Sequence, residues 1–321
     1  MSKKNKLDKI FIFSPKNIKI KNDALHDHGL IPFTEWWYFD ATLNDGYTAQ
    51  MGIRLISLLK LKLVFTRLDI YKDGKLISHE RKTQYMPSFK LSKEKPFIKI
   101  AGKETMKGFI DKDKQKWVYD ISLKLQNTAV DLRFTGSTKG WMGKVPGSIW
   151  GVLLPRADVE GTLEIKKEII KVKGEGYHDH NWNITPRVIF NYGWYWGKTN
   201  SQNYSITWAS VIGNKRNYNT LLMINKKNDG YININPKNIE LILGDYRKFK
   251  KKKIPYNFQI KVKDEEAEID LKMKILDIHH VKIMGFMNYF RYHVVYNGFI
   301  DFKGKKEKIN EMRMAELLVF K

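Results

Sequence analysis

The chain has 321 residues, of which 42% are hydrophobic and 13% aromatic, and its formal net charge is +24 at pH 7. This length and composition predict a globular protein of about two domains, and no run of ~18 apolar residues occurs that would predict a transmembrane helix. The absence of cysteine excludes disulfide bonds and thiolate chemistry.

The charge and the N-terminal segment bear on localisation and partners. No continuous apolar region follows the basic start Met1–Asp8, so we expect no signal peptide and a cytoplasmic protein. The lysines are scattered, apart from the run Arg247–Lys253, which we interpret as a solvated hairpin loop. This pattern disfavours nucleic acid as the main partner. It favours peripheral contact with an anionic membrane.

Strand signals dominate the chain from end to end, and turn chemistry such as Asn44-Asp45-Gly46 and Lys72-Asp73-Gly74 separates them. Short helical turns are considered only at 53–65 and 278–288. Many short strands with tight turns predict an all-β protein of antiparallel barrels or sandwiches. Alternating or β-branched segments predict strands at 35–43, 47–55, 62–71, 75–81, 117–124, 130–136, 157–165, 169–182, 192–197, 204–212, 220–225, 239–243, 257–262, 268–275, 289–302 and 313–320.

A weak internal repeat predicts two similar halves. The segment Val159–Lys166 resembles Tyr296–Lys303, and each precedes a basic turn and another alternating strand. We interpret each pair of segments as the closing hairpin of one barrel. The boundary then falls near Pro186, with one domain at 1–185 and the other at 186–321.

The stretch Gly174–Trp182 (Gly-Glu-Gly-Tyr-His-Asp-His-Asn-Trp) carries the main functional signal. Alternate residues of a strand share a face, because side-chain direction has a period of two. One face of this segment therefore begins with apolar residues, continues with two glycines and ends with two histidines and a tryptophan. Glycines on such a face leave room for a neighbouring backbone or a ligand, and the polar groups beyond them suit a pocket floor. The residues of this face are Ile170, Val172, Gly174, Gly176, His178, His180 and Trp182.

Glu35 opens a second informative stretch, because it begins the apolar face that continues with Trp37 and Phe39. A carboxylate above a row of aromatic rings is desolvated, which raises its pKa and suits a general acid near neutral pH. The alternative is a glutamate at the barrel rim, paired with Lys or Arg.

Two indoles form a third candidate feature, since Trp194 and Trp196 share a face of one strand. Stacked indoles suit a flat or polyunsaturated ligand and stabilise a carbocation through their π faces. The alternative is core packing, the commoner use of Trp in a barrel.

The histidine pattern raises the question of a metal. His178 and His180 have His-x-His spacing, as do His26 and His28, and His279-His280 adds a further pair. A metal site needs three or four converging ligands. With no cysteine and no His-x-x-x-His helix motif, we expect no metal. A hydrogen-bonded corner in which Asp179 fixes a backbone or an imidazole is the simpler interpretation.

Three motifs together resemble the carotenoid 1,2-hydratase (hydroxyneurosporene synthase) and AttH-like superfamily. They are Glu35–Phe39, the pair Pro155-Arg156 with Val159–Leu163, and Gly176–Trp182, and Asp27–Gly29 lies ahead of them as in the family. The resemblance implies two lipocalin-like antiparallel β-barrel domains packed together, a lipophilic, often polyene or isoprenoid, substrate and no redox cofactor.

The resemblance also implies site residues. In the hydratases the His and Trp that match His180 and Trp182 are implicated, and a downstream Asp is the proton donor. Here the downstream positions fall near Thr207–Ala209, where no carboxylate occurs, and Asn183 replaces a usual glycine. A substitute acid would be Asp179 or Glu35. Otherwise the pocket catalyses by shape alone, by holding a flexible polyene in a reactive conformation.

These observations lead to one prediction and two alternatives. We expect an enzyme without a cofactor that hydrates, isomerises or cyclises a lipophilic isoprenoid-like or polyene molecule in an apolar cavity beside the imidazoles. The alternatives are a non-catalytic carrier of a lipophilic molecule, and a module whose motifs only stabilise the contact between barrels. The expected catalytic residues are His180, Asp179 and Glu35, and the expected substrate-binding residues are Trp37, His178, Trp182, Trp194 and Trp196.

Overall fold

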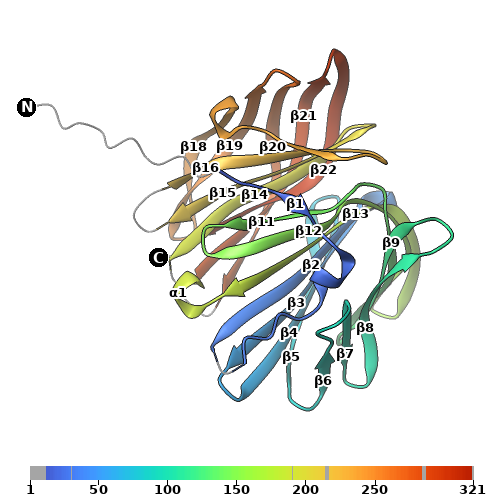
Figure 1. Ribbon diagram of the computed structural model, residues 1–321. Coiled ribbons are helices and arrows are strands. Elements are labelled where there is room, and N and C mark those ends of the chain that lie inside the picture. The colour runs from blue at the N-terminus through green and yellow to red at the C-terminus, as the bar shows by residue number, and fades with distance from the viewer. Residues whose placement is uncertain (1–11, 30, 190, 214–216, 284–286, 320–321) are drawn as a thin grey trace, which may run out of the picture.

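The computed structural model describes residues 12–29, 31–189, 191–213, 217–283 and 287–319, and these form two antiparallel sheets (Figure 1). Predictions that involve residues 1–8, 284–286 and 320 lie outside the described residues. The first sheet curves into a nearly closed barrel and the second into a half-barrel, so the all-β, lipocalin-like prediction is confirmed. No helix among the described residues has the length and apolar character needed to cross a membrane.

The N-terminal sheet follows the order β5-β4-β3-β2-β13-β12-β10-β9-β8-β7-β6, with β11 paired to β12 and β1 to β11. Its strands are β1 (Lys16–Asn17), β2 (Phe33–Leu43), β3 (Tyr47–Leu58), β4 (Leu61–Lys72), β5 (Lys75–Tyr85), β6 (Phe89–Leu91), β7 (Phe97–Ile100), β8 (Lys103–Asp111), β9 (Lys116–Lys124), β10 (Thr128–Gly136), β11 (Trp141–Val145), β12 (Ser148–Ile165) and β13 (Glu168–Ile184).

The C-terminal sheet follows the order β17-β16-β15-β14-β22-β21-β20-β19-β18. A short helix, α1 (Pro186–Ile189), connects the two sheets. The strands are β14 (Tyr192–Asn200), β15 (Tyr204–Gly213), β16 (Asn217–Lys226), β17 (Tyr231–Asn233), β18 (Ile239–Phe249), β19 (Lys252–Lys263), β20 (Ala267–Ile283), β21 (Met287–Phe302) and β22 (Lys305–Val319). Single 3₁₀ turns occur at Ile20–Asp23, Asn44–Gly46 and Pro236–Asn238.

The repeat in the sequence corresponds to equivalent hairpins. β13 pairs with β12 and with β2, the first long strand of its sheet, and β22 pairs with β21 and with β14 in the same way. Gly161 and Gly298, which match in the repeat, both have φ near +150°. A side chain there would meet the carbonyl oxygen of the neighbouring strand. The helical turns considered at 53–65 and 278–288 are wrong, because their described residues lie almost entirely in β3, β4, β20 and β21. The division into domains 1–185 and 186–321 stays a prediction.

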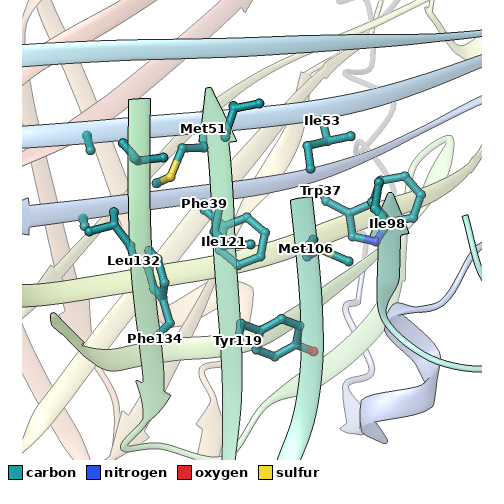
Figure 2. Packing of buried hydrophobic residues seen from close by; sticks show 14 of the residues in the cluster. Trp37, Phe39, Met51, Ile53, Ile98, Met106, Tyr119, Ile121, Leu132 and Phe134 are labelled. Atoms are coloured by element: carbon teal, nitrogen blue, oxygen red, sulfur yellow. The ribbon is translucent and has the colours of Figure 1, made fainter. Parts of the chain in front are cut away.

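The interior of the N-terminal barrel is filled with side chains (Figure 2). Phe39 packs against Tyr119 and Phe134, and these rings and the Trp37 indole are at most 1% exposed. Small barrels with this filling hold a packed core and not a ligand. The glycines of β13 do not open it, because a side chain at Gly176 would collide with the Phe134 ring.

The two sheets contact each other through the outer faces of β2, β12 and β13. These faces pack on β14–β16 through an aromatic cluster that includes Tyr38, Trp150, Tyr177 and Trp196. Buried ion pairs also cross the interface: Arg291 to Asp69 at 2.5 Å and Lys198 to Asp40 at 2.7 Å. Strands β2 and β13 are therefore covered on both faces, by the barrel core on one and by the second sheet on the other.

Candidate functional site

Consecutive residues of the His-Asp-His motif face two different environments. In β13, His178, His180 and Trp182 point into the N-terminal barrel, where His180 lies opposite Trp37 of β2. Asp179 and Asn181 point toward the second sheet, opposite Tyr38 and Trp36. The alternation of the strand therefore divides the candidate residues into an inner set and an outer set.

The inner set is a buried ion network. Asp23, at the end of the first 3₁₀ turn, lies 3.0 Å from His178 Nε2 and 3.1 Å from His180 Nδ1. The other nitrogen of His180, Nε2, is 2.7 Å from Glu35 Oε1, and Glu35 also contacts His26 Nδ1 at 3.1 Å. All except the half-buried His26 are fully buried.

Opposite charges dominate the titration of this network. Burial alone would lower the pKa of His180, but the carboxylates of Glu35 and Asp23 outweigh it and raise the pKa to about 9. Burial alone would raise the pKa of Glu35, yet the neighbouring His180 and His26 shift that pKa downward. Glu35 is thus an ionised partner of an imidazolium and not the high-pKa acid that the sequence suggested. Its partners are histidines and not the Lys or Arg of the alternative.

Aromatic rings close the space around these imidazoles. Trp37 stacks on His180 with ring centroids 4.5 Å apart, and Trp182 stacks on His26 at 4.4 Å. Phe39 stacks on His178 at 3.7 Å. The apolar cavity expected beside the imidazoles is therefore replaced by packed protein. Of the expected site residues, Glu35, Trp37, His178, His180 and Trp182 do not line the cavity described below.

One group of residues has donors close enough together to hold a metal ion. The ligand atoms of His26, Glu35 and His180 lie within 4.8 Å of one another, and no other such group of three occurs in the described part of the chain. The ion pairs with Asp23 and Glu35 account for the same positions without a metal. We therefore interpret the cluster as a structural ion network.

The outer set borders a cavity of about 130 Å³ between the two sheets. For comparison, an engineered apolar cavity of about 150 Å³ is large enough to take up benzene. Half-exposed residues at its rim, including Pro146, Val188 and Tyr192, leave it open on one side, so that a longer ligand can extend out of it. Its aromatic wall consists of Trp36, Tyr38, Trp150, Tyr192, Trp194 and Trp196.

Both expected indoles of β14 belong to this wall. Trp194 stacks on Trp36 of β2 with centroids 6.0 Å apart, and Trp196 meets Tyr38 edge-on at 5.7 Å. Each pair joins one sheet to the other. The wall therefore offers aromatic faces and edges from both sheets to a ligand between them.

Asp179 is the main ionisable group on this wall, and it is 6% exposed. Its carboxyl accepts hydrogen bonds from Trp150 Nε1 at 3.0 Å, the Tyr177 hydroxyl at 2.9 Å and Asn181 Nδ2 at 3.2 Å. Burial raises the pKa of Asp179 to about 7 against these hydrogen bonds, helped by the nearby carboxyls of Glu316 and Asp40. A carboxyl with this pKa can both donate and take up a proton at neutral pH.

A second carboxyl, that of Glu316 in β22, also lines the cavity. Burial raises its pKa, although the neighbouring Arg291 and a hydrogen bond from the Tyr289 hydroxyl oppose the shift. Arg54 of β3 stacks on the Trp36 ring, 4.6 Å from its centroid. These groups add charged side chains to a lining that is mostly aromatic and aliphatic.

Sequence reasoning missed Trp36, Tyr38, Arg54 and Glu316. A usable signal existed for the first two, because Trp36-Trp37-Tyr38-Phe39 is apolar at every position and not at alternate ones. A continuous apolar run indicates a strand that is buried on both faces. Arg54 lies opposite Trp36 across the β2–β3 hairpin. Glu316 lies far away in the sequence, and only the packing of the sheets brings it to the Trp36 side of the cavity.

The sequence was compared with protein families and with curated proteins. No family model matches the sequence. Over 225 residues the chain is 24% identical to hydroxyneurosporene dehydrogenase of Chlorobaculum tepidum, and the match covers 56% of each chain. The chain thus spans little more than half the length of this curated relative.

Solved structures match over nearly the whole chain. A putative AttH from Nitrosomonas europaea has a TM-score of 0.69 at 13% identity and covers 94% of this chain and 97% of its own. Kievitone hydratase from Nectria haematococca has a TM-score of 0.57 at 11% identity, covering 95% and 93%. The fold is a lipocalin-like pair of sheets. More particularly, it is the fold of the AttH-like protein and of kievitone hydratase, and the sequence is similar to hydroxyneurosporene dehydrogenase, in agreement with the resemblance of the motifs.

Proposed function

We propose that this protein is an enzyme that acts on a lipophilic, isoprenoid-like or polyene molecule in the cavity between the sheets, and that Asp179 is its proton donor. The observation that carries the proposal is a buried carboxyl with a pKa of about 7 on the wall of a largely apolar cavity. Clefts in which a perturbed acid faces apolar walls are the usual setting for general acid catalysis.

The proposed step begins with the transfer of the Asp179 proton to one carbon of a double bond. The π electrons form the new C–H bond and leave a cation on the neighbouring carbon, which the faces of Trp36 and Trp194 stabilise. Addition of water, whose proton returns to the Asp179 carboxylate, gives the hydrate. Loss of a proton from an adjacent carbon to the same carboxylate gives an isomer, and attack by a second double bond before that loss gives a ring.

The composition of the cavity wall favours an enzyme over a carrier. A carrier needs only an apolar enclosure, whereas here Asp179, Asn181, Arg54 and Glu316 converge on one aromatic cavity. Burying a carboxyl lowers stability unless hydrogen bonds or charge pairing offset the cost. Two such groups on one apolar cavity are the kind of perturbed acids that functional sites contain. The names of the relatives, one a hydratase and one a hydroxyneurosporene enzyme, support small-molecule chemistry of this kind.

His180 receives a different role in this proposal from the one that the sequence suggested. Both of its nitrogens face carboxylates inside the barrel, so it has no contact with the cavity through which to hold a water molecule. We propose that it holds β13 against β2 and the first 3₁₀ turn. It is then a positioning residue for Asp179, its neighbour in the chain.

Replacing Trp194 with alanine is expected to weaken the binding of a polyene roughly ten- to hundredfold. The substitution removes the ring that faces Trp36, and burying a large side chain contributes about 1.5–3 kcal/mol. Titration of the purified protein with a soluble polyene, followed by tryptophan quenching, measures the effect. Organic extraction with mass spectrometry shows whether the wild type co-purifies with a lipophilic molecule.

Tyr246→Ala is the matched control, because Tyr246 is an exposed aromatic residue of β18 outside the cavity. The Tyr246→Ala variant should bind the polyene with the same affinity as the wild type. Equal binding by Trp194→Ala and the wild type, or no binding by either, would contradict the proposal that the polyene binds in the cavity.

A further inference from the structure

The turn between β3 and β4 lies at one end of the N-terminal sheet (Figure 1). Apolar side chains around this turn are exposed on the outer face of the sheet. Leu58, Leu59, Leu61 and Tyr85 are 46%, 60%, 51% and 60% exposed, and Phe65 is also exposed. We call this surface the apolar strip. It consists of Ile56, Leu58, Leu59, Leu61, Leu63, Phe65 and Tyr85.

Strand register makes the apolar strip continuous. Leu58 lies opposite Leu61, Ile56 opposite Leu63, and Leu63 opposite Tyr85 of β5. Paired residues of antiparallel strands share a face, and the alternate residues Leu55 and Val64 fill the barrel core. In an antiparallel sheet with one solvated face, the residues on that face are usually polar. At this end of the sheet the residues on the outer face are apolar instead.

The backbone conformation of Leu59 in the β3–β4 turn suggests that this residue contacts something outside the molecule. Leu59 has φ +57°, a left-handed conformation that Gly, Asn and Asp adopt more readily than a leucine. Its side chain is mostly exposed, so it gains little from the core in return for this strain. An exposed leucine at such a position is better explained by contact with something apolar outside the molecule.

The apolar strip starts at the cavity. Arg54, which lines the cavity, lies opposite Phe65 and shares its face with Ile56 and Leu58. Leu58 lies four positions after Arg54 along β3, which corresponds to about 13 Å. The strip thus links the cavity with the end of the sheet.

We propose that the apolar strip docks on an anionic lipid bilayer, with the Leu58–Leu61 turn in the interfacial region. This inference rests on the proposed function, because a lipophilic substrate is concentrated in membranes. The net charge of +24 is complementary to an anionic surface, and Lys60 lies within the turn itself. Beside it, Asp27 pairs with Lys62 at 3.3 Å and Lys93 at 2.8 Å, so the local carboxylate is neutralised. A narrow convex turn suits insertion between headgroups better than a flat protein interface.

Co-sedimentation of the full chain with vesicles tests the proposal. The vesicles contain phosphatidylcholine, with or without phosphatidylglycerol. The wild type should bind the anionic vesicles, and the double variant Leu59→Asn, Leu61→Gln should bind them at least about tenfold more weakly, since it loses two inserted leucines. Asn is well suited to the left-handed conformation of residue 59, so the fold is retained. Ile169→Asn, at a residue that is 69% exposed on β13, is the matched control and should bind like the wild type.

Three results would overturn the docking. They are no binding of the wild type to anionic vesicles, equal binding of wild type and double variant, and a wild-type dimer in sedimentation velocity that the double variant loses. The last would assign the strip to a second copy of the chain. The vesicle assay contains no substrate, so its failure leaves the cavity tests with a soluble polyene unaffected. Failure of those tests alone would count against the proposed function and not against the docking.

Discussion

Asp179→Asn is expected to reduce turnover by about 10²–10⁴-fold, the usual contribution of a positioned general acid. Asparagine has nearly the same shape and can still accept hydrogen bonds from Trp150 and Tyr177, but it cannot release a proton. Binding of the substrate should change little. Single-turnover kinetics and equilibrium titration with the same polyene separate the two effects.

The pH profile gives this prediction a second readout. The proton donor is active when protonated, and burial raises the pKa of Asp179 to about 7. Turnover by the wild type should therefore be constant at lower pH and fall as the pH rises through about 7. Any residual activity of Asp179→Asn should lack that transition.

A neighbouring carboxylate provides the control for Asp179. Asp158 lies in β12, is exposed and is absent from the cavity wall, so Asp158→Asn should keep both the rate and the pH profile. If Asp179→Asn turned over substrate at the wild-type rate with the wild-type profile, the acid would have to be another group on the wall. Glu316 would be the first candidate.

His180→Ala is expected to lower the free energy of unfolding by about 3–5 kcal/mol, because removing one partner of a buried ion network leaves the others uncompensated. Asp23 and Glu35 would remain in the barrel without the imidazolium between them. Urea denaturation followed by circular dichroism measures the loss. Ligand affinity of the fraction that is still folded should be close to that of the wild type.

The stability of the wild type should depend on pH in a direction set by His180. Its pKa is raised to about 9 in the folded state, above the value of ~6.5 expected in the unfolded chain. The folded state then binds the proton more tightly, so the stabilisation is complete below about pH 6.5 and is lost as the pH rises through about 9. His180→Ala should remove this part of the dependence.

His28→Ala is the matched control for the stability measurement, because His28 is half-exposed, in the same N-terminal segment and outside the ion network. The free energy of unfolding of His28→Ala should be close to that of the wild type. Full stability of His180→Ala combined with lost turnover would contradict the structural role and restore a catalytic one.

The sequence predicted the strands well because they depend on local alternation and turn residues. It also predicted which candidate residues share a face: His178 with His180, and Trp194 with Trp196. What it could not predict is which face of β2 and β13 the second sheet covers, since that depends on tertiary packing between the two sheets and not on the local pattern of either strand. The cavity was therefore expected on the imidazole face, whereas it lies on the face of Asp179.

The glycines of β13 show the same limit in another form. An inward glycine predicts that something approaches closely, without saying what. At Gly174 the approaching group is the backbone of β2, and at Gly176 it is the Phe134 ring. Both come from strands that are distant in the sequence, and together they remove the space that a ligand would need.

The central claim is that the ligand occupies the cavity between the sheets, and photo-crosslinking tests it most directly. An isoprenoid probe with a diazirine group would be bound to the wild-type protein, irradiated and mapped by peptide mass spectrometry. We expect labels on Trp36, Tyr38, Trp194 and Trp196, and their loss on competition with an unlabelled polyene. Labels concentrated on Phe39, Tyr119 and Phe134 in the barrel interior would contradict the account.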